Sequence, residues 1–276
     1  MLKTRVLTAL ILFGLLLVAL FVLPTVGWSI LVLVVIMQGA VEWARLSGMR
    51  GRQASLYWVV ILLSMLALLW LDANTTATQQ VYFHMPVYLV SALLWLIIAP
   101  TWLMIGWKID QPVLMAATGW AVLVPTGLAM LDLRATPPMP WVLLAVMGLV
   151  WVADISAYFA GRRFGTHKLA PEISPGKTWE GVGGAIIGVT IYILLVWRFN
   201  PAFLPREALP GLLLASWWWV CLAVIGDLFE SAIKRQAGVK DSGALLPGHG
   251  GLLDRIDALT STLPLAALAM LLQKLA

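Results

Sequence analysis

Most of the side chains that could do chemistry lie in one stretch near the C-terminus, residues 231–257, which reads SAIKRQAGVKDSGALLPGHGGLLDRID. The stretch contains four basic residues, three aspartates and one histidine in a glycine-rich turn, and it joins two apolar segments. These chemically active residues are Lys234, Arg235, Lys240, Asp241, His249, Asp254, Arg255 and Asp257. Because charges of both signs are present, the stretch is more than a basic anchor for anionic lipid.

Two pairs of acidic residues flank or enter this stretch. Asp227 and Glu230 are three residues apart, as are Asp254 and Asp257, and this spacing places each pair on one face of a helix. Carboxylates on two helices can hold a hard cation such as Mg²⁺, which takes carboxylates, substrate phosphates and water as ligands. Basic side chains nearby would neutralise further phosphate charge, so the composition favours phosphoryl or nucleotidyl transfer.

For two parts of the stretch a plainer interpretation remains open. Asp254 and Asp257 could simply stabilise the N-terminus of a helix, whose dipole favours negative charge. His249 could bind phosphate or act as an acid–base group, or it could only form a hydrogen bond within the turn. Ser231 and Lys234 extend the helix face of the first acidic pair, which favours a role for that face in binding.

A second informative segment is residues 153–181, ADISAYFAGRRFGTHKLAPEISPGKTWEG. Asp154 follows an apolar run, and a carboxylate inside a bilayer costs about 2.5–3.5 kcal/mol. We therefore expect Asp154 to face a wet cavity with a cationic or metal partner; the alternative is a structural ion pair with a nearby arginine. Gly176-Lys177-Thr178 resembles the end of a phosphate-binding loop, but Pro171 occupies the position of the required glycine and no strand is expected before it. Ser174 and Lys177 could still bind phosphate individually.

The composition places the chain among integral membrane proteins. Of its 276 residues 61% are hydrophobic and only 11% are charged, and its mean hydropathy is +0.93. A membrane-spanning helix needs about 20 mostly apolar residues. We predict an all-α polytopic protein with nine spans and a polar cavity facing the cytoplasm. The predicted spans are 5–23, 26–41, 56–71, 87–106, 111–131, 141–160, 181–197, 211–229 and 258–274.

The distribution of basic residues predicts the orientation. With the N-terminus inside and nine alternating spans, 14 of the 18 Lys and Arg residues fall on the inner side. Since inner loops of membrane proteins are enriched in Lys and Arg, this favours a cytoplasmic N-terminus and a cytoplasmic 231–257 stretch. The same bias accounts for the basic composition, so nucleic acid is not expected as a partner. Cys221 is the only cysteine, which excludes an intramolecular disulfide.

The two halves of the chain differ in polar content. Residues 1–140 hold few acids, and we interpret them as scaffold helices; residues 141–276 are predicted to be the catalytic transmembrane domain. In the first half, residues 72–86 are expected to form a polar outer loop, with His84 as an exposed residue of that loop.

The C-terminal residues resemble the signature of the phosphatidate cytidylyltransferases, also called CDP-diacylglycerol synthases. The signature has Ser, an aliphatic residue, Lys-Arg, Lys-Asp, Gly, Leu-Pro, His-Gly-Gly, Asp-Arg and Asp at set spacings. It is matched without a gap by Ser231, Ile233, Lys234, Arg235, Lys240, Asp241, Gly243, Leu246, Pro247, His249, Gly250, Gly251, Asp254, Arg255 and Asp257. Segments 157–165 and 173–181 are also similar to the family. One departure is Ala258, where many members have serine.

The resemblance implies a reaction in which CTP and phosphatidic acid give CDP-diacylglycerol and pyrophosphate, without an enzyme nucleophile. It implies catalytic roles for Asp227, Lys234, Asp254 and Arg255. The implied metal ligands are Asp227, Asp254, Asp257 and Asp241. Substrate binding is implied for Asp154, Ser174, Lys177, Ser231, Arg235, Lys240 and His249. Mg²⁺ is the implied cofactor, with a second, monovalent cation such as K⁺ as an option.

The same resemblance implies partners and a location. CTP, phosphatidic acid and membrane lipid are the expected partners, and a homodimer is an option. The expected location is the bacterial cytoplasmic (inner) membrane, with the active site on the cytoplasmic side.

Two functions from other classes compete with this interpretation. An ion-coupled transporter would also carry intramembrane acids such as Asp154 and Asp227, but the charges lie on one side and the sequence shows no inverted repeat. A CTP-dependent lipid-alcohol kinase would share the nucleotide and the metal, but it would not be expected to keep the whole signature. Analysis of the labelled lipid product separates the three.

Overall fold

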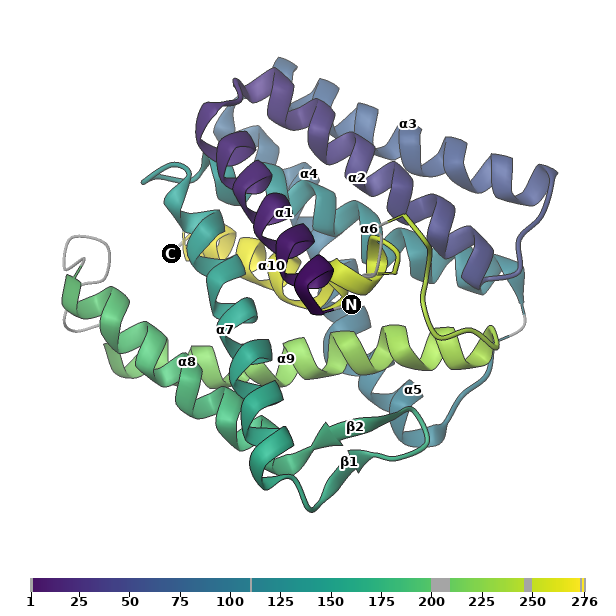
Figure 1. Ribbon diagram of the computed structural model, residues 1–276. Helices are drawn as coiled ribbons and strands as arrows, with labels where there is room; N and C mark the ends of the chain where they lie inside the picture. Colours follow the sequence, from purple (N-terminus) through teal and green to yellow (C-terminus); the bar gives the residue numbers. More distant parts are fainter. Residues whose placement is uncertain (1, 110, 200–208, 246–249, 274, 276) are drawn as a thin grey trace.

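The protein is a bundle of long apolar helices, described here from a computed structural model (Figure 1). The structure describes residues 2–109, 111–199, 209–245, 250–273 and 275. The helices are α1 (Leu2–Val22), α2 (Thr25–Leu46), α3 (Arg52–Asn74), α4 (Ala77–Leu93), α5 (Ala99–Ile105), α6 (Pro112–Ala135), α7 (Trp141–Phe164), α8 (Trp179–Phe199), α9 (Leu209–Gln236) and α10 (Leu253–Gln273). A π-helical turn, η1 (Leu94–Ile98), joins α4 to α5, so these form one span. Eight helical segments in the described residues are long and apolar enough to cross a membrane, and Leu10–Val22 of α1 is a shorter apolar helix.

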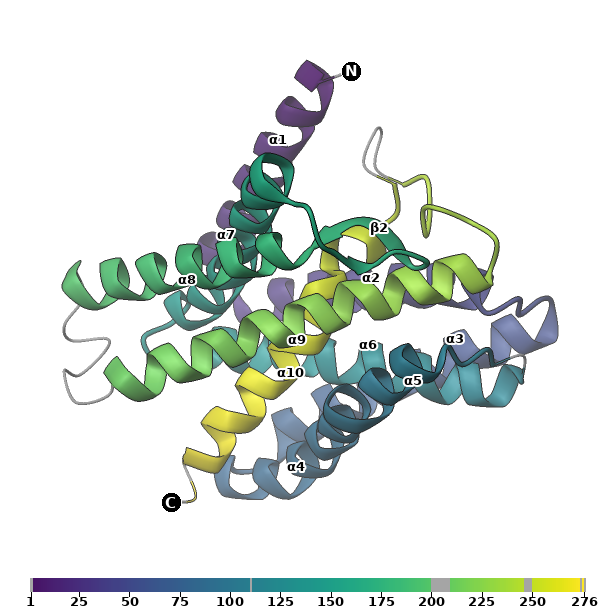
Figure 2. The ribbon, with the colours of Figure 1, turned by 90° about the horizontal axis from the view of Figure 1, so that it is seen from below.

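These segments confirm the prediction of an all-α polytopic membrane protein, and each predicted span has a helical counterpart. In lipid the backbone must satisfy its own hydrogen bonds, so apolar runs of this length become helices. α10 is central: it packs against α9, α6, α4 and α7, as Figures 1 and 2 show. The last helix is thus embedded among helices of both halves. The proposed division of the chain at residue 140 stays a prediction.

Three features differ from the sequence-based expectations. The expected loop 72–86 is largely helical, because α3 continues to Asn74 and α4 begins at Ala77. Thr76 and Gln79 form a capping box that starts α4: the Gln79 backbone N–H donates to the Thr76 hydroxyl at 3.4 Å, and the Thr76 N–H donates to the Gln79 side chain at 2.9 Å. α9 also continues to Gln236, about two turns beyond the predicted end, which places Lys234 and Arg235 on a helix.

The third difference is a short β-hairpin between α7 and α8. Strand β1 (Lys168–Ala170) pairs antiparallel with β2 (Ser174–Thr178), with Lys168 opposite Thr178. A strand therefore does precede Gly176-Lys177-Thr178, contrary to expectation. The residues nevertheless lie in the second strand of a hairpin, and Pro171 still occupies the glycine position, so the arrangement is not a phosphate-binding loop of the strand–loop–helix type.

α9 and α10 approach closely at Gly226. A Cβ atom placed there would lie 2.5 Å from the Ser261 hydroxyl oxygen and 2.8 Å from the Asp257 carbonyl oxygen. The Asp257 carbonyl belongs to the backbone and cannot rotate away. The absence of a side chain at residue 226 is therefore what allows the acidic residues of the two helices to come together.

We expect Gly226→Ala to destabilise the protein by about 1–3 kcal/mol, because the methyl group overpacks the contact with α10. Thermal unfolding in detergent measures this effect. Gly211→Ala is the matched control on the same helix, since a Cβ there meets nothing within 4 Å. Equal unfolding temperatures for the two variants would show that the α9–α10 contact is looser than described.

Candidate active site at the inner ends of three helices

The predicted site residues come from four elements that meet at one end of the bundle. The alternation of spans predicted above would place this end on the cytoplasmic side, so we call it the inner end. It contains the end of α7, the β1–β2 hairpin, the end of α9 and the start of α10 (Figure 2). β2 contacts both α7 and α8, and Lys177 on β2 reaches α9. Residues that are far apart in sequence are thus brought to one place.

Lys234 lies at the centre of one half of the site. Its ammonium nitrogen is 2.9 Å from Glu230 Oε2 and 2.6 Å from Asp254 Oδ1. The lysine and Glu230 are buried, so removal of either carboxylate would leave a buried charge with less compensation. This ion pair joins the end of α9 to the first turn of α10.

Asp254 also holds the segments that precede α10. These segments, residues 237–245 and 250–252, carry part of the signature and are called the signature loop below. The second oxygen of Asp254, Oδ2, accepts hydrogen bonds from the backbone N–H groups of Ser242 and Gly251, both at 2.8 Å. Asp254 therefore has a structural role in holding these residues, together with its ion pair to Lys234. A cation at Oδ1 would have to share that oxygen with the lysine.

The other half of the site is built around Asp227. Lys177 Nζ lies 2.6 Å from Asp227 Oδ2, and the Ser231 hydroxyl donates to Asp227 Oδ1 at 3.3 Å. Asp154 on α7 is exposed, and its electrostatic neighbours are Asp227, Lys177 and Arg255. Cationic groups therefore lie near Asp154. That this carboxylate faces a wet cavity stays a prediction.

Asp257 connects the two halves. Its Oδ1 accepts a hydrogen bond from the backbone N–H of Ala258 at 2.7 Å, and its strongest electrostatic neighbours are the carboxylates of Asp227 and Glu230, with Asp154 also close enough to interact. Carboxylates from α7, α9 and α10 therefore share one region. The hydroxyl that many similar sequences carry at position 258 is replaced here by a buried methyl group.

The remaining predicted residues lie around this core or beyond it. Arg235 is exposed and donates to the carbonyl oxygen of Ile173 at 3.3 Å, which joins α9 to the hairpin. Ser174 is half-buried in β2, while Arg255, Lys240 and Asp241 are exposed. His249 lies outside the described residues, together with Leu246 and Pro247 of the signature.

The donor set fits a hard cation. Five carboxylates (Asp154, Asp227, Glu230, Asp254 and Asp257) face three basic groups (Lys177, Lys234 and Arg255). Among the described residues Glu230 Oε1 is buried without a hydrogen-bond partner. Oxygen-only ligands and excess negative charge suit Mg²⁺, which needs only one or two carboxylates when substrate phosphates and water complete its shell.

The described part of the chain contains no group of three of these acids with ligand atoms within 4.8 Å of one another. A cation here would therefore depend on substrate oxygens for much of its coordination. An inner-face cavity of about 630 Å³ is lined by Glu42, Arg45, Arg50, Gly243 and Leu245 among others. It lies beside the signature loop rather than among the predicted acids, so a single cavity shared by Asp154, Asp227 and Asp254 stays a prediction.

Glu42 on α2 is a site residue that sequence reasoning missed. Its carboxylate is 2% exposed and accepts hydrogen bonds from the Ser242 hydroxyl at 2.8 Å and from the backbone N–H groups of Leu252 and Leu253, both at 2.9 Å. It also accepts from the Gln38 side chain at 3.0 Å. Glu42 thereby anchors the signature loop and the start of α10 to the N-terminal half of the chain.

We expect Glu42→Gln to lower kcat/KM about tenfold, a change of about 1.4 kcal/mol. The amide nitrogen of glutamine would face a hydrogen-bond donor where a carboxylate oxygen of Glu42 accepts a hydrogen bond. We therefore expect the loop beside Asp254 to shift. Steady-state kinetics with a separate KM for CTP, together with thermal unfolding, measures the effect. Gln38→Ala is the control, since it removes a partner of Glu42 that does not touch the loop.

A lower unfolding temperature with an unchanged KM for CTP would assign Glu42 a role in stability alone. Unchanged kinetics and stability would show that other contacts position the loop.

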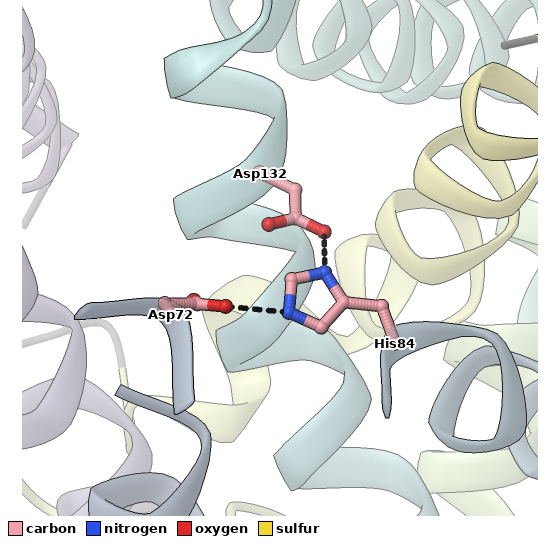
Figure 3. Close-up of side chains that lie close together, drawn as sticks. All are labelled: Asp72, His84 and Asp132. Atoms are coloured by element: carbon pink, nitrogen blue, oxygen red, sulfur yellow. Dashed lines mark hydrogen bonds and ion pairs between the residues drawn. The ribbon is translucent and has the colours of Figure 1, made fainter. Parts of the chain in front are cut away.

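A second polar cluster lies at the opposite end of the bundle. His84 on α4 is 3% exposed, and its two ring nitrogens face Asp132 Oδ2 at 2.9 Å and Asp72 Oδ1 at 2.8 Å (Figure 3). The expectation that His84 is an exposed loop residue is therefore wrong, because α4 begins before it and turns it toward α3 and α6. Potential ligand atoms of the three residues all lie within 4.8 Å of one another, a geometry consistent with a divalent cation.

Comparison with known proteins agrees with the family that the signature resembles. The family model described as "Cytidylyltransferase family" matches residues 3–273. Phosphatidate cytidylyltransferase of Haemophilus influenzae is 35% identical over 96% of both chains, and that of Pseudomonas aeruginosa is 37% identical over 97% of this chain and 96% of its own. Phosphatidate cytidylyltransferase of Brucella melitensis is 43% identical over 49% of each chain. This chain belongs to the cytidylyltransferase family.

Proposed function

We propose that this protein is a phosphatidate cytidylyltransferase, which makes CDP-diacylglycerol and pyrophosphate from CTP and phosphatidic acid. The observation that carries the proposal is the meeting of the signature residues at one end of three membrane helices, in a chain that matches the named relatives along nearly its whole length. An apolar bundle with a charged inner end suits this pair of substrates, because phosphatidic acid is held in the bilayer and CTP arrives from water.

In this reaction an oxygen of the lipid phosphate attacks the α-phosphorus of CTP. The bond between the α-phosphorus and the oxygen bridging to the β-phosphate breaks, and pyrophosphate leaves with that oxygen. No covalent bond to the protein is needed, so the protein must position two polyanions and reduce their repulsion. Attacking oxygen and phosphorus must come within about 3–3.5 Å.

The basic residues have the roles of phosphate ligands in this proposal. Lys177 and Lys234 are held by Asp227 and Asp254, so their ammonium groups are already in place when the phosphates arrive. Arg255 is exposed and close enough to interact with Asp154, so we assign it a phosphate contact as well. We assign further phosphate contacts to Ser174, Ser231, Arg235, Lys240 and His249.

The acids would hold the cation that the family resemblance implies. We propose that Asp227, Asp254 and Asp257 supply ligands for Mg²⁺, one or two carboxylates to an ion with substrate oxygens and water in the remaining positions. Asp241 is a further proposed ligand, and a monovalent cation such as K⁺ is a proposed second ion. When bound, Mg²⁺ supplies charge neutralisation for the phosphates. Asp227 is the most available ligand because it is half-buried and its partner Lys177 belongs to the hairpin rather than to a neighbouring helix.

The protein is an integral membrane protein. We propose that it resides in the bacterial cytoplasmic membrane with its N-terminus and this site on the cytoplasmic side, where CTP is available. A homodimer stays a prediction.

Labelled nucleotide tests the proposal directly. Purified protein in detergent, supplied with Mg²⁺ and phosphatidic acid, should transfer label from [α-³²P]CTP into lipid and release label from [γ-³²P]CTP as pyrophosphate. In a parallel assay with a lipid alcohol in place of phosphatidic acid, transfer of the γ-label into lipid would identify a kinase instead. No label in lipid from either nucleotide would overturn both enzymatic functions.

A further inference from the structure

The cluster of Asp72, His84 and Asp132 lies at the other end of the bundle from the proposed reaction site. Asp72 is near the end of α3, His84 is in the second turn of α4 and Asp132 is near the end of α6. None of the predicted catalytic or metal-binding residues belongs to it. We propose that this cluster is a second metal site, which binds a borderline divalent cation such as Zn²⁺ and joins the three helices.

The types of ligand select the class of metal. One imidazole and two carboxylates form a mixed nitrogen and oxygen set, which suits Zn²⁺ and related transition metals. Mg²⁺ instead prefers an all-oxygen shell in near-octahedral geometry. The cluster is therefore suited to a different cation from the one proposed at the inner end.

Neighbouring side chains hold the proposed ligands in place through hydrogen bonds. Tyr88, which is fully buried, donates to Asp132 Oδ2 at 2.7 Å and restricts the orientation of that carboxylate. The Gln80 side chain donates to the backbone carbonyl of Asp72 at 3.1 Å and joins α3 to α4. Such partners orient the ligands and are a regular part of metal sites.

An adjoining cavity supplies the independent observation that the cluster is accessible. The cavity has a volume of about 860 Å³, and its lining includes Asp72, Gln80, Asp132 and Arg134. It gives a metal ion a path to the two carboxylates and space for the water molecules that complete its shell. His84 itself is nearly enclosed, so an ion would reach it from the carboxylate side.

The hydrogen bonds of the cluster show what a metal ion must replace. Each ring nitrogen of His84 faces a carboxylate oxygen, and an ionised carboxylate only accepts hydrogen bonds. One nitrogen must lose its proton to bind a metal, while the other can keep its hydrogen bond to a carboxylate, an arrangement common around zinc-bound histidine. An ion held by His84 and by both aspartates requires more: His84 must move away from one aspartate, so that bonds to the metal replace the hydrogen bond between them.

Metal analysis of the full-length protein tests the site. Protein in detergent is stripped with a chelator, dialysed against ZnCl₂ or MgCl₂ and assayed for bound metal and unfolding temperature. We expect about one tightly bound Zn²⁺ per chain and a higher unfolding temperature, because an ion that binds only the folded state stabilises it. Mg²⁺ should not substitute.

Two variants and a control separate this site from other ligands. Asp72→Asn keeps the size of a partly exposed side chain and should lose the bound Zn²⁺, as should His84→Gln. His167→Ala is the matched control, since His167 is exposed at the inner end beside Glu180 and should not affect binding. If His84→Gln does not fold, Asp72→Asn alone decides.

Wild-type protein without bound Zn²⁺, or Zn²⁺ retained by Asp72→Asn, would overturn the proposal. In that case the cluster is an ion triad of two carboxylates and a protonated imidazole.

Discussion

Replacement of Asp227 by asparagine is expected to lower kcat at least 100-fold, a loss of about 2.7 kcal/mol of transition-state stabilisation. Asp227 orients Lys177 and is the most available of the proposed metal ligands, and asparagine keeps its size without its charge. The measurement is the initial rate of CDP-diacylglycerol formation at saturating CTP and phosphatidic acid. Because Asp227 is not fully buried, the variant should still fold and insert.

Asp254→Asn should reduce kcat to a similar extent and also lower the unfolding temperature. Its carboxylate pairs with buried Lys234 and accepts two backbone N–H groups, and the amide cannot replace both functions. Glu172→Gln is a control for both variants, because Glu172 is an exposed acid in the hairpin. Near wild-type turnover in Asp227→Asn would remove Asp227 from the site.

Removal of divalent cations should abolish turnover. The carboxylates at the inner end exceed the nearby basic groups, and two further polyanionic substrates must bind there, so the charge needs a cation to balance it. Initial rates in excess EDTA, followed by addition of MgCl₂, measure the loss and the recovery. Full turnover in EDTA would contradict the proposed cofactor.

The same experiment on Asp72→Asn shows which metal site matters. If the inner site holds the required cation, this variant should lose its activity in EDTA and recover it with MgCl₂ as the wild-type protein does. A variant that stays inactive with MgCl₂, while the wild-type protein recovers, would assign the dependence to the cluster of Asp72, His84 and Asp132.

The membrane spans and the elements that carry the signature could be predicted from sequence because both depend on local patterns. Apolar runs of about 20 residues must form helices in lipid, and the spacing of Asp227 and Glu230 alone places them on one helix face. That this end of the bundle faces the cytoplasm stays a prediction from the distribution of Lys and Arg. The family assignment is confirmed by the family model and the curated relatives.

Contacts between residues far apart in the chain could not be predicted in this way. Glu42 and Ser242 are 200 residues apart, and no pattern in either segment indicates the other. A buried glutamate in an apolar helix was the available signal, since such a residue needs several donors. His84 was assigned wrongly because its polar neighbours suggested a loop, whereas two of them, Thr76 and Gln79, start a helix.

The length of α9 bears on the depth in the membrane at which the proposed reaction takes place. Its 28 residues extend about 42 Å at 1.5 Å per residue, whereas the hydrocarbon core is about 30 Å thick. We expect the surplus to be the polar C-terminal part with Glu230, Lys234 and Arg235, and we expect this part to lie at the level of the lipid phosphates. A lipid substrate can react there while its acyl chains stay in the leaflet, and only the nucleotide and pyrophosphate cross the water boundary. The rate should then follow the mole fraction of phosphatidic acid in a mixed micelle, so dilution with inert detergent at constant bulk concentration should slow the enzyme.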